Sequence, residues 1–167
     1  MSTALYTFIE SPVGALWLVA DDEALQVIEF RNPRHPIARA PHWREGDNAV
    51  LREATRQLGA YFRGERRDFD LPLSPRGTDF QRQVWRTLAG IPYGETISYR
   101  ELARRVGKPT AMRAVGAANG RNPLPIVLPC HRVIGADGSL TGFGGGLPTK
   151  QFLLTLEGAL RAGDLFA

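Results

Sequence analysis

The sequence is poor in cysteine, with a single one, Cys130, among its 167 residues. One thiol cannot form an intrachain disulfide, and it cannot supply the several cysteines that a structural zinc site usually needs. We therefore expect neither a disulfide nor a cysteine-based zinc site. Cys130 is then either a small buried apolar side chain or a reactive nucleophile, and its neighbours must decide between the two.

Long hydrophobic runs are also missing. No run approaches the ~20 apolar residues that cross a bilayer, and the N-terminus lacks the basic start and small-residue end of a secretory signal. We therefore expect a cytoplasmic protein without a membrane partner. The composition, 43% hydrophobic and 23% charged, is that of a globular chain with one large or two small domains.

Positive charge is concentrated in the second half of the chain. Residues 1–76 hold 10 Arg and 11 acidic residues, a net charge of −1, whereas residues 77–167 hold 9 Arg, 2 Lys and 6 acidic residues, a net charge of +5. A basic cluster within residues 99–121 faces one acid, Glu101, and consists of Arg100, Arg104, Arg105, Lys108, Arg113 and Arg121. Such a cluster suits contacts with phosphates, although a solvated charged face has the same composition.

The first half predicts a small sheet with one helix. Short apolar runs separated by turn residues predict an antiparallel meander of three strands over residues 4–10, 14–20 and 24–30. Three prolines make residues 31–46 a loop. Asp47 is then the expected cap of a helix with helically spaced apolar residues, which ends before Gly64. A linker rich in proline and glycine closes this first domain, residues 1–76.

The second half, residues 77–167, is predicted to be mostly helical. Capping boxes that begin at Thr78 and Ser98 open two helices, and Thr110 is the expected cap of a third helix, which ends at Asn119-Gly120. The second and third helices flank a glycine-containing turn, a helix-turn-helix pattern that generic helical hairpins share. Arg113 lies on the second helix of this pair.

An apolar run over residues 124–128 is predicted to be extended and to lead into Pro129-Cys130-His131-Arg132-Val133. A glycine-rich loop over residues 142–146 follows, and Thr149 is expected to open the last helix. Glu157 lies on or beside the buried face of that helix near its C-terminal end, where the helix dipole disfavours a carboxylate. A carboxylate at this place requires a partner.

Cys130, His131 and Glu157 together could form a nucleophilic site. A thiol with an ordinary pKa of ~8.5 is mostly protonated at neutral pH, whereas the thiolate is the nucleophile. A histidine can take the proton, and a carboxylate can fix the imidazole tautomer. Because neighbouring residues on an extended strand point to opposite faces, we expect a water molecule to carry the proton from Cys130 to His131.

At these residues the sequence resembles the O6-alkylguanine-DNA alkyltransferases, also called methylated-DNA–protein-cysteine methyltransferases. The resemblance covers residues 77–158 and lies in the runs Thr78-Asp79-Phe80-Gln81, Ile91-Pro92-Tyr93-Gly94-Glu95-Thr96, Arg113-Ala114-Val115-Gly116, Asn119-Gly120-Arg121-Asn122-Pro123, Pro129 to Val133 and Gly142 to Gly146. It implies an α/β (α+β) protein with an N-terminal ribonuclease-H-like domain, a three-stranded antiparallel sheet with a helix. The C-terminal domain would be mostly helical, winged-helix or helix-turn-helix-like, and would bind DNA.

The resemblance implies a one-use repair reaction on double-stranded DNA that bears an alkylated guanine, with O4-alkylthymine left open as a second substrate. The damaged base is flipped out of the duplex. Cys130 would accept the alkyl group, His131 would act as the base through water, and Glu157 would orient His131. Asn122 would anchor the turn before the active-site strand. Tyr99 would meet the rotated nucleotide, and its hydroxyl would assist the leaving guanine.

The resemblance also assigns the DNA contacts. The third helix would enter the minor groove, and Arg113 would fill the gap left by the flipped base. The other expected contacts are Tyr99, Ala114, Gly116, Ala117 and Arg121. Small side chains let a helix approach DNA closely, although they equally suit close helix packing, and Arg113 could instead contact a phosphate.

The expected substrate pocket contains Val133, Phe143, Gly144 and Gly145. Several relatives have Tyr and Ser where this chain has Phe143 and Gly144, so hydrogen bonds from those two side chains are lost. We expect no metal and no other cofactor. The protein is expected to be a monomer in solution, and cooperative assembly on DNA is left open.

Two other functions compete with this interpretation. The helix-turn-helix and the basic cluster would also suit a regulator that binds DNA without reacting. Cys130, His131 and Glu157 would also suit a cysteine hydrolase, although such an enzyme has no use for the basic surface.

Overall fold

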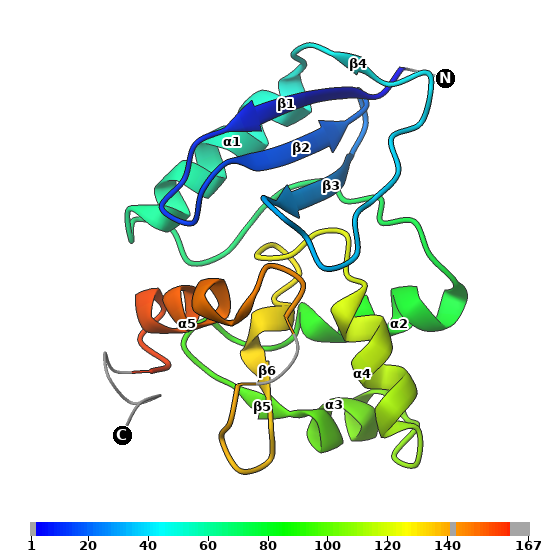
Figure 1. Cartoon of the computed structure of the whole chain (residues 1–167), viewed down its shortest axis with the longest axis vertical. Helices are drawn as coiled ribbons and strands as arrows, with labels where there is room; N and C mark the ends of the chain where they lie inside the picture. Colours follow the sequence, from blue (N-terminus) through cyan, green and yellow to red (C-terminus); the bar gives the residue numbers. More distant parts are fainter. Residues whose placement is uncertain (1–2, 141–142, 161–167) are drawn as a thin grey trace.

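The computed structural model describes residues 3–140 and 143–160. A sheet and helix α1 form one end of the molecule, and the remaining helices form the other end (Figure 1). Both the sheet with a helix in the first half and the helical second half agree with the sequence-based expectation.

The N-terminal sheet contains the three predicted strands, β1 (Leu5–Ile9), β2 (Leu16–Ala20) and β3 (Leu25–Phe30), as an antiparallel meander. A fourth strand, β4 (Arg44–Glu45), pairs parallel to β1, so the order is β3-β2-β1-β4. This corrects the prediction of a continuous loop over residues 31–46. A two-residue exposed strand has no alternating pattern that a sequence could reveal.

Helix α1 (Ala49–Phe62) packs against this sheet and buries Leu51, Ala54 and Leu58 completely. Its N-cap is Asn48, not the predicted Asp47. The Asn48 side chain accepts a hydrogen bond from the Leu51 amide at 2.8 Å and donates one to the Ala20 carbonyl at 3.0 Å. Asn48 therefore caps the helix and also ties it to β2, whereas Asp47 pairs with Arg52 on the surface.

The helices of the second half begin with α2 (Asp79–Leu88), and the predicted capping box of Thr78 and Gln81 is confirmed. Ser98 caps α3 (Tyr99–Val106), but the Glu101 carboxylate binds Arg104 and Arg105 instead of completing a box. Helix α4 (Met112–Gly120) ends as predicted. It has no side-chain cap, so the prediction for Thr110 was wrong, and Ala111 takes the N-cap position.

The segment that leads to Cys130 is a turn, not the predicted extended run. The Leu128 amide donates to the Leu124 carbonyl at 2.9 Å, and Ile126 has a φ of 74°. Leu124 and Ile126 are buried in this turn. The apolar run therefore reflects burial in the core and not a strand. A 3-10 helix, η1 (Cys130–Arg132), follows, and then β6 (Val133–Ile134) pairs parallel with β5 (Ile97–Ser98).

Helix α5 (Leu147–Leu156) starts earlier than the prediction from Thr149. Its first turn contains Pro148, a position where the missing amide proton of proline costs nothing. Glu157 is the C-cap of α5 and is buried, as its place in the sequence predicted.

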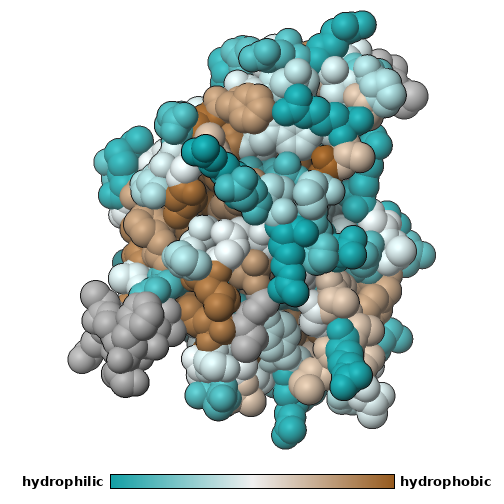
Figure 2. Space-filling model, in the orientation of Figure 1, coloured by the Kyte–Doolittle hydropathy of each residue, from teal (hydrophilic) through white to brown (hydrophobic). Residues whose placement is uncertain are grey.

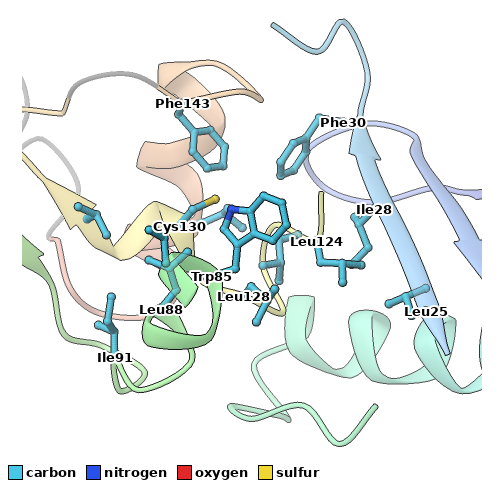
Figure 3. Packing of buried hydrophobic residues seen from close by; sticks show 14 of the residues in the cluster. Leu25, Ile28, Phe30, Trp85, Leu88, Ile91, Leu124, Leu128, Cys130 and Phe143 are labelled. Carbon is cyan, nitrogen blue, oxygen red and sulfur yellow. The ribbon is translucent and has the colours of Figure 1, made fainter. Parts of the chain in front are cut away.

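One hydrophobic core spans both halves (Figure 3). Ile28 and Phe30 of β3 meet residues of the second half, and the Phe30 ring lies 5.4 Å from the Phe143 ring. Trp85 of α2 lies in the same cluster and donates its indole N–H to the Ala118 carbonyl at 2.8 Å. The sheet therefore packs directly on the elements that carry Cys130.

On the surface, hydrophobic residues lie in small groups among hydrophilic ones (Figure 2). Among residues 3–140 and 143–160, the large exposed apolar side chains are Phe8, Met112, Leu147 and Phe152. Within residues 3–140 and 143–160, no helix has the length and apolar character needed to cross a membrane.

Candidate active site around Cys130

Cys130 opens η1, at the junction between the two halves. Its side chain is 5% exposed, and it lines a cavity of about 370 Å³. Asn122 shapes the approach to it by donating to the Leu128 carbonyl at 2.7 Å and accepting from the Leu124 amide at 3.0 Å. The turn that the sequence assigned to Asn122 is thus held by both ends of its amide group.

His131 and Glu157 meet in the interior of the protein. The His131 Nε2 atom lies 2.7 Å from Glu157 Oε2, and both side chains are fully buried. The end of α5 carries Glu157 to this position, and η1 carries His131. The pair that the sequence predicted is therefore in hydrogen-bond contact.

Two further residues in the described part of the chain bind the Glu157 carboxylate, and neither was predicted from the sequence. Arg132 donates from Nε to Oε1 at 2.8 Å and from Nη2 to Oε2 at 3.0 Å, and its Nη1 donates to the Ile91 carbonyl at 2.6 Å. Tyr61 of α1 donates its hydroxyl to Oε2 at 2.6 Å. The position of Arg132 next to His131 was a usable signal, whereas nothing local marks Tyr61.

These contacts fix the charge of the carboxylate and the tautomer of the imidazole. Burial alone would raise the pKa of Glu157, but the hydrogen bonds from His131 and Arg132 hold it at about 2. An ionised carboxylate only accepts, so His131 Nε2 carries the proton and Nδ1 has a free lone pair. Nδ1 is buried and has no partner among the described residues. Burial also lowers the pKa of His131, which keeps the ring neutral and available as a base.

The Cys130 thiol is protonated in the resting protein. Burial raises its pKa to about 11, although the Asn122 side chain and the Lys150 cation both favour the thiolate. Lys150, which the sequence analysis also missed, is fully buried, and its Nζ donates to the Val133 carbonyl at 2.6 Å. Burial lowers the pKa of Lys150 to about 8. Reaction at Cys130 thus requires that a base removes its proton.

Cys130 and His131 lie in a 3-10 helix, not on the strand that we predicted. Consecutive side chains in such a helix are about 120° apart, so they still diverge. Cys130 faces the cavity, and His131 faces Glu157. No direct hydrogen bond joins these two side chains in the described part of the chain.

Three of the predicted DNA-contact residues lie on one outer surface of α4. Arg113, Ala114 and Ala117 are exposed, and Arg121 is exposed just beyond the helix. Gly116 is half-buried and faces Tyr99, and a Cβ atom at this position would lie 3.7 Å from the Tyr99 ring. Tyr99 is also half-buried, with Lys150 Nζ 5.9 Å from its ring centre.

The predicted pocket residues divide into two groups. Phe143, Gly144 and Gly145 line the cavity next to Cys130, together with Asn119 and Asn122. The fourth predicted pocket residue, Val133, is not among its lining residues, and its carbonyl instead binds Lys150. Tyr99, which was predicted to meet the rotated nucleotide, does not line the cavity either. Gly142 lies outside the described residues.

The N-terminal half supplies the other wall of the cavity, which sequence reasoning did not foresee. Lining residues come from β3 and from residues 33–43. The Arg34 amide donates to the Gly144 carbonyl at 2.9 Å, and this hydrogen bond joins the N-terminal wall of the cavity to the glycine loop. In the described part of the chain no group of three or more His, Cys, Asp and Glu side chains could hold a metal ion.

Comparison with known proteins accounts for both halves. Residues 79–159 match the model of the 6-O-methylguanine DNA methyltransferase DNA-binding domain, and residues 4–75 match the ribonuclease-like domain of the same family. The chain belongs to the 6-O-methylguanine DNA methyltransferase family. This family is the one that the sequence motifs indicated.

Relatives in the family are similar over nearly their whole length. The methylated-DNA–protein-cysteine methyltransferase of Methanosarcina acetivorans is 51% identical over 154 residues, which are 92% of this chain and 98% of that protein. The Mycobacterium tuberculosis protein of the same name is 48% identical over 160 residues, 96% of each chain. The crystal structure of Mycobacterium tuberculosis OGT in complex with DNA superposes with a TM-score of 0.85 at 47% identity, and the match covers 98% of this chain and 99% of that one.

Proposed function

We propose that this protein repairs alkylated DNA by moving the alkyl group from guanine O6 to the sulfur of Cys130. The observation that carries the proposal is a single buried cysteine that lines a cavity and precedes a histidine bound to an ionised glutamate. Membership in the 6-O-methylguanine DNA methyltransferase family supports the same reaction.

The reaction begins with the Cys130 proton. His131 Nδ1 accepts this proton through one bridging water, because the two side chains diverge. Glu157 keeps Nδ1 unprotonated beforehand and stabilises the imidazolium afterwards. Removal of the proton leaves the sulfur as a thiolate at the moment of attack.

The thiolate then attacks the alkyl carbon, and the carbon–oxygen bond breaks. The bonding electron pair stays on guanine O6, the guanine anion takes up one proton from solvent, and the His131 imidazolium returns its proton to solvent. The products are therefore unmodified guanine and an S-alkylcysteine. We assign Tyr99, which lies beside Gly116 of α4 and outside the lining of the cavity, as the group that meets the rotated nucleotide and assists the leaving guanine. A thioether is a poor leaving group and no second thiol is present, so each molecule reacts once.

Double-stranded DNA is the proposed partner, and α4 is the proposed contact. The exposed surface of α4 combines Arg113 with the small side chains of Ala114 and Ala117, which leaves its backbone accessible. Arg113 fills the space of the flipped base, and Arg121 adds a positive charge beside it. A structure of the Mycobacterium tuberculosis relative in complex with DNA supports DNA as the partner.

The test is to incubate the protein with duplex DNA that contains O6-methylguanine and to measure the mass of the tryptic fragments. We expect the fragment that contains Cys130 to gain the mass of one methylene group while the DNA loses the methyl group. An unmodified Cys130 fragment with the DNA still methylated would refute the proposal and favour a regulator that only binds DNA.

The matched control is Cys130→Ser, which keeps the size of the side chain and removes the sulfur. This variant is expected to bind the lesion duplex and to transfer nothing. Transfer by Cys130→Ser would show that another residue is the nucleophile. Repeated turnover of an ester substrate with a burst phase would instead indicate a hydrolase.

A further inference from the structure

Tyr61 contacts the active-site carboxylate from the other half of the chain. It lies in the last turn of α1, is completely buried, and donates its hydroxyl to Glu157 Oε2 at 2.6 Å across 96 positions of sequence. Helix α1 belongs to the N-terminal end of the molecule and α5 to the other end (Figure 1). This hydrogen bond therefore joins the N-terminal domain directly to the His131–Glu157 pair.

Packing alone does not explain a tyrosine at this position. Its ring contacts the rings of Phe62, Phe69 and Tyr93, with centroid distances of 5.3, 5.5 and 6.3 Å. A phenylalanine would make the same contacts without burying a hydroxyl that needs a partner. The hydroxyl finds that partner in Glu157, so the choice of tyrosine is tied to the carboxylate.

Among the residues that the structure describes, the donors to Glu157 Oε2 are His131, Arg132 and Tyr61. A carboxylate oxygen that accepts three hydrogen bonds is held in place, and each donor takes up part of its negative charge. Burial, together with the neighbouring Glu157 charge, raises the pKa of Tyr61 far above its ordinary value, so Tyr61 stays a donor at every pH at which the protein works.

We propose that Tyr61 is a positioning residue for alkyl transfer, through which the N-terminal domain sets the strength of the base His131. The inference rests on the proposed function. The hydroxyl holds Oε2 in place toward His131 Nε2. It also takes up part of the negative charge of Oε2, which weakens the attraction between the carboxylate and the imidazolium. Without it, Oε2 would hold the imidazolium more strongly, and the neutral ring would be less abundant.

Other contacts join the sheet on which α1 packs to the second half of the chain. The Ile28 amide donates to the Pro123 carbonyl at 2.8 Å, and the Arg34 amide donates to the Gly144 carbonyl. The shared hydrophobic core adds to these bonds. The N-terminal domain is thereby bound to segments that precede and follow Cys130 in the sequence, and Tyr61 adds a contact at the carboxylate.

The titration of His131 depends on every charged or titratable group around the pair. The groups that act on His131 or on Glu157 are Glu157 itself, Arg132 and Lys150, with Tyr61 and Tyr93 beside the carboxylate and Arg67 over the Tyr93 ring. Tyr61→Phe changes one of them and leaves the others. Because a neutral donor to Glu157 is lost, the pKa of His131 should rise.

The experiment compares the rate constant of alkyl transfer in wild type, Tyr61→Phe and the control Tyr6→Phe. Tyr6 lies in β1 and packs on a separate hydrophobic cluster, so this control removes a tyrosine hydroxyl away from Glu157. We expect Tyr61→Phe to lower the plateau rate about tenfold, the effect of one hydrogen bond to a charged group, because Oε2 is no longer held in place toward His131 Nε2. The loss should be equal for lesion duplex and for a free O6-alkylguanine base, and binding of the duplex should not change. The acid limb of the pH–rate profile should move to higher pH, a shift that a merely structural residue would not cause.

A double-mutant cycle asks whether Tyr61 acts through Glu157. In a Glu157→Gln background, Tyr61→Phe should cost little further rate. Should Tyr61→Phe unfold, incorporation of 3-fluorotyrosine at position 61 keeps the ring and strengthens the donor, and the acid limb should then move to lower pH. An unchanged rate and pH profile in a wild-type protein that transfers alkyl groups overturns this inference alone, whereas a wild type without transfer overturns the proposed function.

Discussion

The buried ion pair of Glu157 and Arg132 predicts a large effect of Glu157→Gln on stability. The substitution keeps the shape of the side chain and removes its charge, so Arg132, which is 6% exposed, loses its charged partner and keeps its bond to the Ile91 carbonyl. A buried charge that loses its partner costs about 3–5 kcal/mol. Since small domains are stable by about 5–15 kcal/mol, we expect a folded but clearly weakened variant at pH 7.

The difference in the free energy of unfolding between wild type and Glu157→Gln should depend on pH, because Glu157 is titratable. Glu157 has a pKa of about 2 in the folded protein, because hydrogen bonds from His131 and Arg132 outweigh the effect of burial, against an ordinary value of 4.5. A lowered pKa stabilises the fold fully above pH 4.5, and this stabilisation is lost as the pH falls toward 2. At about 1.36 kcal/mol per pH unit, the whole contribution is about 3 kcal/mol.

The assay is urea unfolding of wild type and Glu157→Gln at pH 7 and at pH 3. The difference in the free energy of unfolding should be about 2 kcal/mol smaller at pH 3, because the wild type has then lost that part of its advantage. Glu53→Gln serves as the control, since Glu53 is an exposed partner of Arg56 and should contribute little at either pH. An equal difference at both pH values would refute the assignment of a low pKa to Glu157.

Two further predictions concern the glycine loop and α4. A Cβ atom at Gly145 would lie 2.5 Å from the Phe30 ring and 2.9 Å from the Phe143 ring, so Gly145→Ala should lower stability by about 1–3 kcal/mol in a thermal or urea melt. Gly144→Ala is the matched control, because its Cβ would lie 3.7 Å from the nearest atom; equal losses in both variants would contradict the clash. Arg113→Ala should weaken capture of lesions in duplex DNA, measured as a lower transfer rate, while its reaction with a free O6-alkylguanine base stays nearly normal. Equal losses on both substrates would indicate misfolding.

Most of the fold could be predicted because its elements carry local signals. The meander follows from three short apolar runs, and α2 from the capping box at Thr78. The errors arise where a tertiary contact decides. Asn48 displaces Asp47 as the cap because it can also reach β2, and residues 124–128 form a turn because the core, not strand pairing, buries their side chains.

The site could be predicted only where its residues adjoin a motif. Cys130, His131 and Glu157 follow from the sequence, and the structure brings the last two into contact. Lys150 and Tyr61 did not stand out, because a lysine in the first half of a helix and a tyrosine on an apolar helix face have ordinary local explanations. Their roles depend on α5 and α1 meeting η1, and this long-range packing is not encoded in any short segment.

The environment of Cys130 reconciles a reactive function with a thiol that is hard to ionise. With a pKa of about 11, about one molecule in ten thousand carries the thiolate at pH 7. A protein that is consumed by its own reaction loses its function whenever a stray electrophile alkylates its cysteine, and burial suppresses that loss. In the proposed mechanism, reactivity arises when the alkylated guanine enters the cavity and the Cys130 proton passes to His131. Burial thus opposes ionisation of the Cys130 thiol, whereas the ionised Glu157 favours proton transfer to His131. We expect the thiolate to form only when the substrate is bound.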